Sequence, residues 1–374
     1  MKYGVNDINS TYHQQIQYEA ALQSFVLLKN DNNALPLKPG QKLAVLGPMG
    51  VAQAGLLSDY ASDDICWEGT FDCIQPLAQG IANINNAAGG STSILKAVDV
   101  NSNDSSNIST AVALAQAADV VILIMGIDKT IEHEGHDRPD TSLPGMQPSL
   151  VTQVLALNKP TILVLSNGGA LAIDDFMQGP SAIVEVFNPA VKGSVALAAT
   201  LFGQENRFGK LPYTMYPHDY INQQPMDNFD MSVAPGRTYR YYTGQPLFPF
   251  GHGLSYSSFE LSCVNGSASY SHTCTVANRG SVGGDEVVMV YHSAGDGVCK
   301  EAKHPVPLRS LVAFERVRVG AGASVSFDLS LTPTMAMLVN EDGVKTLYRG
   351  EHEFIVSRGP GLKTGDDVVV SLTV

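Results

Sequence analysis

The chain has 374 residues, a length that suggests two or three domains rather than one. Only 16% of its residues are charged and its net charge is −13, so it lacks the basic patches with which proteins bind nucleic acids or anionic membranes. No apolar stretch is long enough to span a bilayer, no cysteine–histidine spacing indicates a zinc site, and no cofactor is implied.

In the first part of the chain, helices and strands are expected to alternate. Apolar positions at helical spacing and few breakers predict helices over residues 12–30, 73–84, 107–119, 148–158 and 191–203. Short apolar runs predict strands over residues 42–47, 120–126, 161–168 and 182–187. These strands are apolar throughout, which is typical of a mostly parallel sheet covered by helices on both faces. We therefore predict an α/β domain over residues 1–216.

The pattern changes after this domain. Residues 217–255 are rich in proline, glycine and tyrosine without periodicity, and we expect a linker that packs across the domains. Short strands separated by turns then follow, over residues 259–264, 272–280, 283–294, 311–322, 324–331, 345–359 and 366–374. Seven strands in this length predict that residues 256–374 form an all-β sandwich of the immunoglobulin or fibronectin III type.

Two features favour a secreted protein. Asn-x-Ser/Thr sequons, which are glycosylation candidates, occur at Asn9, Asn103, Asn107 and Asn265. Of the five cysteines, two closely spaced pairs are candidates for disulfides, although five free buried thiols are the alternative; the pairs are Cys66 with Cys73 and Cys263 with Cys274. The first residues contain no apolar segment of a signal peptide, so we expect that the true N-terminus is absent from this chain.

Residues 131–140, "IEHEGHDRPD", place four carboxylates, two histidines and an arginine directly after an apolar strand. Sites in open α/β sheets lie beyond the carboxyl ends of strands, so the position suits a functional loop. On composition alone a charged surface loop is equally compatible. If the segment is extended, Glu132 and Glu134 point the same way, with Cα atoms about 7 Å apart. The histidines have no spacing that indicates a metal site.

Several motifs in order along the chain resemble glycoside hydrolase family 3, in particular its β-xylosidase branch. They are "YEAALQSFVLLKNDNNALPL", "KLAVLGPMG", "LLSDYASDDICWEGTFDCIQPLAQGI", "IMGIDKTIEHEGHDRPDTSLPGMQ", "ENRFGKLPYTMYP" and "FPFGHGLSYSSF", followed by "GDEVVMVY" and "LVAFERV". The resemblance covers residues 15–374 and matches the C-terminal α/β and fibronectin III-like domains of the family. The "SDY" at residues 58–60 departs from the usual Gly-Asn/Asp-Tyr.

The resemblance implies a fragment of a secreted, retaining, exo-acting β-glycosidase that acts on β-linked xylo- or gluco-oligosaccharides, foremost a xylan 1,4-β-xylosidase. The family's first domain, a (β/α)8-type barrel that supplies an aspartate nucleophile and most sugar contacts, has no counterpart in this sequence. A barrel in cis or in trans is therefore an expected partner, and this chain alone is expected to be inactive. The alternative is a non-catalytic glycan-binding or scaffold protein that has lost its barrel.

The resemblance also assigns roles to residues. The family's acid/base is a glutamate shortly before an Asp-Arg dipeptide, which favours Glu134 over Glu132. Asp137 and Arg138 are expected to form a structural ion pair or to brace the loop, with direct catalysis as the alternative. For Trp67, stacking on a sugar and anchoring the cysteine loop are equally compatible. The substrate-binding candidates are Asp59, Tyr60, Trp67, Asp137 and Arg138.

Overall fold

The structure of the chain, a computed structural model, describes residues 4–61, 65–66, 70–266 and 270–374. The chain forms two compact units, residues 1–209 and residues 210–374. In this division, the proline- and tyrosine-rich segment before residue 256 groups with the second unit. Each unit is described by itself.

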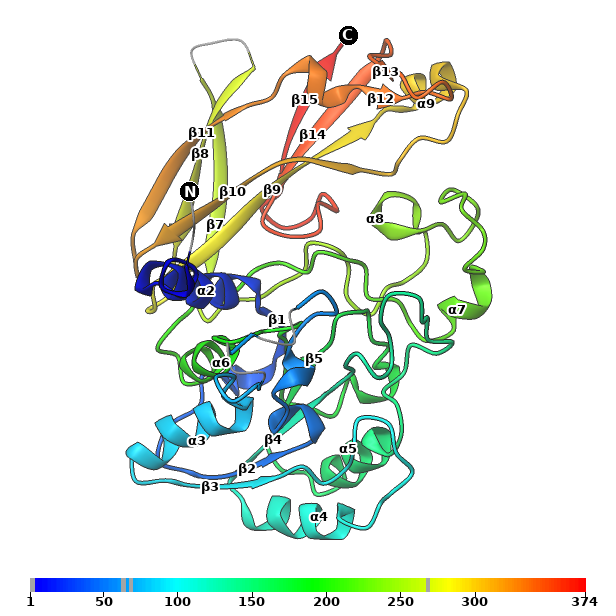
Figure 1. Ribbon diagram of the computed structural model, residues 1–374. Helices are drawn as coiled ribbons and strands as arrows, with labels where there is room; N and C mark the ends of the chain where they lie inside the picture. Colours follow the sequence, from blue (N-terminus) through cyan, green and yellow to red (C-terminus); the bar gives the residue numbers. More distant parts are fainter. Residues whose placement is uncertain (1–3, 62–64, 67–69, 267–269) are drawn as a thin grey trace. The chain divides into compact units, whose positions relative to one another are not determined.

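The first unit is built on a six-stranded sheet with the order β1-β6-β5-β4-β2-β3 (Figure 1). All neighbouring strands are parallel except β1, which pairs antiparallel with β6. The central strands are buried along their whole length, because helices cover both faces of the sheet. The strand bounds are β1 Val26–Asn30, β2 Lys42–Leu46, β3 Ser91–Leu95, β4 Val120–Gly126, β5 Thr161–Ser166 and β6 Ala182–Glu185.

The helices of this unit form two groups. From β3 the chain passes over β2 to β4, so its direction across the sheet reverses. Because crossovers between parallel strands are right-handed, the helices before and after this reversal lie on opposite faces of the sheet. Helices α2 and α3 both pack against α6, and α4 packs against α5. The helix bounds are α1 Val5–Ile8, α2 Thr11–Ser24, α3 Leu77–Ala87, α4 Ile108–Ala117, α5 Gln147–Leu155 and α6 Gly193–Leu201.

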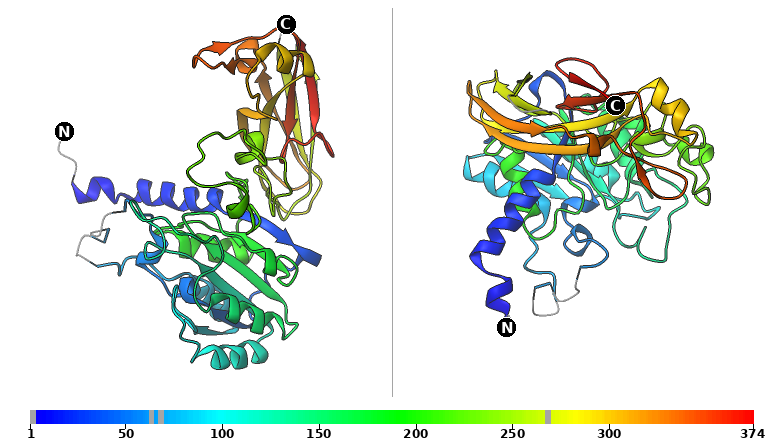
Figure 2. Two further views of the ribbon diagram at one scale, coloured as in Figure 1. Left: turned by 90° about the vertical axis from the view of Figure 1, so that its right-hand side faces the viewer. Right: turned by 90° about the horizontal axis from the view of Figure 1, so that it is seen from above.

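The structure differs from the predicted elements at both edges of the sheet. The helix expected over residues 12–30 ends at Ser24, because Phe25 turns extended and the buried Val26, Leu27 and Leu28 enter strand β1. Strand β3 was not predicted, since its sequence "STSIL" is polar and largely exposed, as suits an edge strand. Figure 2 shows α2 extending away from the sheet toward the N-terminus.

The second unit contains a four-stranded sheet with the order β10-β9-β14-β15 and a three-stranded sheet with the order β11-β8-β7 (Figure 2). Apolar side chains from both sheets form one core, to which Phe259, Val276, Val290 and Phe354 contribute. All seven predicted strands have a counterpart. The bounds are β7 Phe259–Asn265, β8 Ser271–Asn278, β9 Gly284–Ala294, β10 Ser310–Val319, β11 Ser324–Ser330, β12 Leu338–Val339, β13 Lys345–Thr346, β14 Glu351–Ser357 and β15 Val368–Thr373.

Aromatic side chains order the segment that precedes the sandwich. It contains two short helices, α7 Tyr220–Gln223 and α8 Thr238–Tyr241. Tyr239 stacks on Phe250, and both rings pack against the buried Tyr291 of β9. The Tyr239 hydroxyl also accepts a hydrogen bond from the backbone N–H of Leu311 at 2.9 Å. Stacking and hydrogen bonds thus order a segment that has little regular secondary structure.

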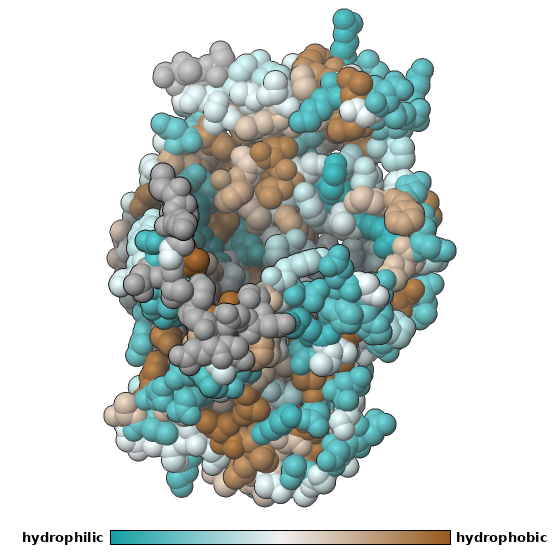
Figure 3. Space-filling view, in the orientation of Figure 1, coloured by the Kyte–Doolittle hydropathy of each residue, from teal (hydrophilic) through white to brown (hydrophobic). Residues whose placement is uncertain are grey.

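Most of the surface seen in Figure 3 is polar, and apolar side chains gather near α3 and the β2–β3 edge of the first unit. Within the ranges that the structure describes, no helix is long and apolar enough to cross a membrane.

Candidate active site

The candidate site lies at the carboxyl edge of the parallel sheet. Strand β2 pairs with β3 on one side and with β4 on the other, so the chain leaves neighbouring strands β2 and β4 in opposite directions. A crevice beyond the strands forms where the strand order reverses in this way. The loops that follow β2, β4, β5 and β6 meet at this edge.

These four loops surround an open cavity of about 280 Å³. The lining combines four carboxylates with one lysine and one tyrosine, a composition suited to polar, hydroxyl-rich ligands. Its lining residues are Leu57, Ser58, Asp59, Tyr60, Ile127, Asp128, Lys129, Glu132, His133, Glu134, Gly168 and Asn188.

The charged loop after β4 folds into a tight turn. His133 and His136 form an isolated antiparallel bridge, with N···O distances of 3.2 and 2.9 Å between their backbone groups. Gly135 has a φ of +79°, a backbone conformation that residues with a side chain rarely adopt. Glu134 therefore stands at the exposed tip of the turn. The segment is not extended throughout, because the chain reverses at residues 133–136 and Glu134 lies in this turn.

An ion pair closes the base of this turn. Arg138 Nε donates to Glu132 Oε2 at 2.6 Å, and Arg138 Nη2 donates to the carbonyl oxygen of Ala170 in the loop after β5. Only 10% of the Arg138 side chain is exposed, against 34% for Glu132. A Cβ atom at Gly169 would lie 2.2 Å from Glu132 Oε1, so the loop after β5 leaves no room for a side chain there. The Glu132 carboxylate is thus fixed between two loops.

The predicted ion pair between Asp137 and Arg138 is not formed. Arg138 instead pairs with Glu132, and Asp137 is exposed. The physical reason is the turn: when residues 133 and 136 pair, residue 132 comes opposite residue 137 and near residue 138. Adjacent residues of an extended strand, such as 137 and 138, point to opposite sides.

Asp59 connects the loop after β2 to the tip of the turn. The backbone N–H of Glu134 donates to Asp59 Oδ2 at 2.8 Å. The Glu134 carbonyl oxygen in turn lies 2.8 Å from Nδ1 of His133, whose ring stacks on that of His136. The backbone of Glu134 is therefore held on both sides, while its side chain is exposed.

The structure separates the predicted substrate-binding residues into three groups. Asp59 and Tyr60 line the cavity, and 81% of Tyr60 is exposed. Asp137 and Arg138 do not line it, and Trp67 lies outside the described residues. Sequence reasoning overlooked Asp128, Lys129 and Asn188 in the lining; their positions directly after β4 and β6 were the available signal.

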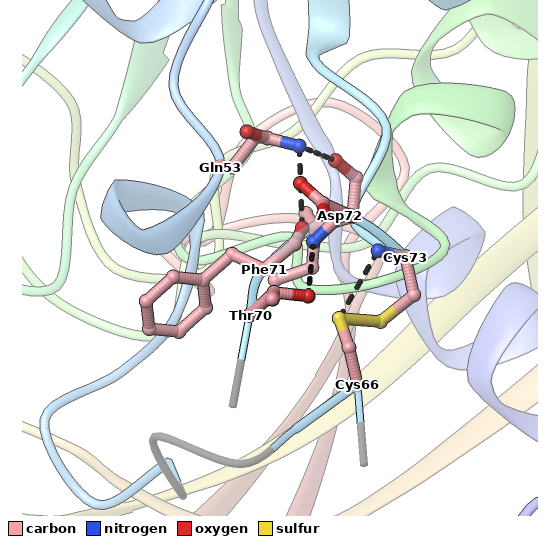
Figure 4. The surroundings of a disulfide bond; sticks show 7 residues. Gln53, Cys66, Thr70, Phe71, Asp72 and Cys73 are labelled. Atoms are coloured by element: carbon pink, nitrogen blue, oxygen red, sulfur yellow. Dashed lines mark hydrogen bonds between the residues drawn. A yellow bond between two sulfur atoms is a disulfide. The ribbon is translucent and has the colours of Figure 1, made fainter. Parts of the chain in front are cut away.

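A disulfide lies in the segment of the chain that follows Tyr60 (Figure 4). Cys66 is bonded to Cys73, and the backbone N–H of Cys73 points to Cys66 Sγ at 3.1 Å. The amide of Gln53 donates to the carbonyl oxygens of Phe71 and Ile74, at 3.2 and 3.0 Å. The C-terminal end of this cysteine loop is therefore tied to the segment after β2.

The remaining predicted modification sites are a second cysteine pair and the sequons. A second disulfide joins Cys263 to Cys274, and Cys299 is an exposed free thiol. The sequon asparagines are all exposed: Asn9, Asn103, Asn107 and Asn265.

Comparison with known proteins identifies the family. Residues 25–256, more than half of the chain, match the model of the glycosyl hydrolase family 3 C-terminal domain. The chain belongs to glycosyl hydrolase family 3. Residues 286–359, which follow this match, match the model of a fibronectin type III-like domain.

Relatives with xylosidase and glucosidase names share both domains. β-D-Xylosidase 1 of Arabidopsis thaliana is 32% identical over 94% of this chain. A family 3 exo-β-xylosidase solved with a xylobiose aziridine probe superposes with a TM-score of 0.83 over 98% of the chain, at 28% identity. The family 3 β-glucosidase of Bifidobacterium adolescentis gives a TM-score of 0.81 over 99%, at 27% identity.

The chain spans about half the length of these relatives: 49% of the Arabidopsis protein, 49% of the xylosidase structure and 54% of the Bifidobacterium enzyme. The other half of each relative has no counterpart in this chain.

Proposed function

We propose that this family 3 chain supplies the acid/base half of a retaining, exo-acting β-glycosidase, foremost a xylan 1,4-β-xylosidase of carbohydrate catabolism. The observation that carries the proposal is the different surroundings of two neighbouring glutamates. Both line the cavity, but Glu132 is bound to Arg138, whereas Glu134 stands at an exposed turn tip. Glu134 is the carboxyl group that remains available for chemistry.

The proposed reaction needs a second carboxylate. A retaining glycosidase uses two carboxyl groups about 5–5.5 Å apart, one as nucleophile and one as acid/base. Glu132 is a poor nucleophile candidate because its carboxylate is held by Arg138, on the same short turn as Glu134. We assign the nucleophile to a barrel domain outside this chain, in the half of the relatives that the chain does not span.

In this assignment Glu134 acts twice. It first protonates the glycosidic oxygen as the nucleophile attacks the anomeric carbon, which expels the leaving sugar. It then takes a proton from the water that hydrolyses the glycosyl-enzyme intermediate. An exposed carboxyl group on a held backbone suits both steps, since it must reach a leaving group and later a water.

The exposed ring of Tyr60 and the carboxylates that line the cavity support a β-linked xylo- or gluco-oligosaccharide as substrate. The apolar C–H face of a sugar packs well on an aromatic ring, and its hydroxyl groups need polar partners. The names of the relatives favour xylose over glucose.

The proposal extends to location. Four exposed sequons and two disulfides support a secreted protein, because both modifications belong to the secretory route and disulfides persist in oxidising surroundings.

Hydrolysis of p-nitrophenyl β-xyloside and β-glucoside tests the proposal. The chain is assayed alone and with a barrel domain from the same source, in one polypeptide or as a separate chain. We expect activity only with the barrel, and its loss by a factor of about 10²–10⁴ in Glu134→Gln. Activity of the chain alone, or a fully active Glu134→Gln enzyme, would contradict the proposal. Inactivity in every combination would favour the glycan-binding or scaffold alternative.

A further inference from the structure

We propose that Asp59 is a positioning residue for Glu134: its carboxylate holds the turn tip through the Glu134 backbone amide and so sets where the acid/base group stands. This inference rests on the proposed role of Glu134. The two residues come from different loops, after β2 and after β4, and the 2.8 Å bond between Glu134 N and Asp59 Oδ2 joins them.

Apart from the bond to Asp59, few contacts fix the tip of the turn. Its base is fixed by the Glu132–Arg138 pair, and its two arms are joined by the backbone bridge and the ring stacking of His133 and His136. Beyond that bridge stand Glu134 and Gly135, both exposed, and the Cβ position of Gly135 has no neighbouring atom within 4 Å. The bond to Asp59 is the contact that ties this tip to another loop, among the hydrogen bonds of the described residues.

The chemistry of Asp59 fits the role. An ionised carboxylate only accepts hydrogen bonds, and a bond from an amide to a charged acceptor is stronger than one to a neutral acceptor. Asp59 is half-buried at the cavity rim, and its bond to the Glu134 amide is exposed to water. The bond is made to the Glu134 main chain, so the Glu134 carboxyl group stays available for a leaving group.

The consequence for catalysis follows from geometry. A turn tip released from Asp59 can rotate about the His133–His136 bridge, and this rotation moves the Glu134 side chain relative to the cavity. A displacement of about 1 Å at a reacting group can lower the rate by about 10²-fold. The sequence-based interpretation of Asp59, direct binding of the sugar, predicts instead a loss of substrate affinity.

Nuclear magnetic resonance on the full chain tests the contact without any assay of activity. The Glu134 amide is assigned with the help of Glu134→Gln, and its proton shift and its exchange with solvent are measured. In the unmodified chain we expect the amide to be protected by its bond to Asp59. In Asp59→Ala its proton shift should change and its exchange should accelerate by about tenfold or more.

Two variants sharpen the result. Asp59→Asn keeps an acceptor oxygen without the charge, so it should keep the amide protected. Asp72→Ala removes an exposed carboxylate from the nearby cysteine loop and should leave the Glu134 amide unchanged. A Glu134 amide that keeps its shift and protection in Asp59→Ala would overturn the proposal.

Kinetics of the barrel-complemented enzyme distinguish positioning from sugar binding. We expect Asp59→Ala to lower kcat by about 10–100-fold with little change in KM, and Asp59→Asn to restore most of kcat. A raised KM with unchanged kcat would overturn the positioning role. If the complemented enzyme is inactive with its natural residues, the proposed function fails, whereas the resonance measurement still decides whether Asp59 holds the tip.

Discussion

Glu132 and Glu134 are two positions apart, yet their carboxylates have different surroundings. The Glu132 side chain lies between Arg138 and the backbone of Gly169, whereas Glu134 is exposed. The first is suited to holding the loop and the second to chemistry, and the two roles can be measured separately.

Isosteric changes of the two glutamates should affect stability differently. Glu132→Gln removes the charge that Arg138 binds, and we expect the free energy of unfolding to fall by about 1 kcal/mol, since the partly exposed carboxylate is screened by solvent. Glu134→Gln should stay within about 0.5 kcal/mol of the unmodified chain. Urea unfolding followed by circular dichroism measures both. Equal effects of the two changes would contradict this division of roles.

Gly169 tests how closely the loop after β5 approaches the acid/base turn. A Cβ atom there would lie 2.2 Å from Glu132 Oε1 and 2.9 Å from Arg138 Nη2. We expect Gly169→Ala to lower the free energy of unfolding by about 1–3 kcal/mol, because the ion pair must move. Gly50→Ala is the control, since its nearest neighbour, Ile124 Cδ1, is at an ordinary 3.6 Å. A Gly169→Ala chain as stable as the control would show that the turn is not packed there.

At the scale of elements, two cross-strand contacts strengthen the sandwich. Cys263 and Cys274 are direct partners in the pairing of β7 with β8. His292 of β9 and His352 of β14 lie side by side in the other sheet, with 3.0 Å between Nε2 of the first and Nδ1 of the second. Each contact leads to its own prediction.

The disulfide is expected to stabilise the second unit mainly by restricting its unfolded state. The bond closes a short loop, with a sequence separation of 11, so replacing both cysteines by serine should cost about 2–3 kcal/mol of unfolding free energy. Thermal and urea unfolding of Cys263→Ser/Cys274→Ser against the oxidised chain measure this. Cys299→Ser, at an exposed free thiol, is the matched control and should be neutral. Equal stability of the two variants would contradict the prediction.

The histidine pair should make the sandwich sensitive to acid. His352 Nε2 lies 3.0 Å from the Tyr348 carbonyl, to which it must donate, so His352 Nδ1 accepts from His292 Nε2. Burial, together with the neighbouring His352, lowers the pKa of His292 from 6.5 to about 4. Its folded-state pKa is therefore below the unfolded one. Stability is full at neutral pH and is lost as the pH falls from 6.5 toward about 4.

Urea unfolding at several pH values tests this behaviour. Over that window the unmodified chain should lose about 2–3 kcal/mol more than His292→Gln, since one pKa unit corresponds to about 1.4 kcal/mol. Replacing the exposed His13 by glutamine provides the control and should not change the slope. Parallel curves for the unmodified chain and His292→Gln would show that the buried pair does not drive the acid sensitivity.

At the scale of the whole molecule, the sequence predicted the architecture better than the site. Local pattern alone predicts strands β4 and β5 and the seven strands of the sandwich. The apolar or alternating residues of each of these strands indicate by themselves which positions are buried. Strand β1 was merged with α2, since "FVLLKN" continues an apolar helical pattern and becomes a strand only by pairing with β6. Tertiary pairing, not propensity, decides such a segment.

The arrangement of the site depends on contacts between loops far apart in sequence. By resemblance, the sequence named Asp59, Glu132, Glu134 and Arg138 as site candidates, and the loops that carry them are in contact. It could not show that Arg138 binds Glu132 or that Asp59 binds the Glu134 amide, because both contacts arise from the turn at residues 133–136. The Glu-Gly pair at the tip was the available signal for that turn.

The central claim, that Glu134 is the acid/base of a site completed by another domain, is tested most directly by azide rescue. Azide is an anion and attacks a glycosyl-enzyme intermediate without a general base, so it replaces only the missing base function. With an aryl β-xyloside that has a good leaving group, azide should accelerate the barrel-complemented Glu134→Ala enzyme by about tenfold or more and yield β-xylosyl azide. Glu132→Ala should not respond. Rescue of Glu132→Ala, with no response of Glu134→Ala, would contradict the account.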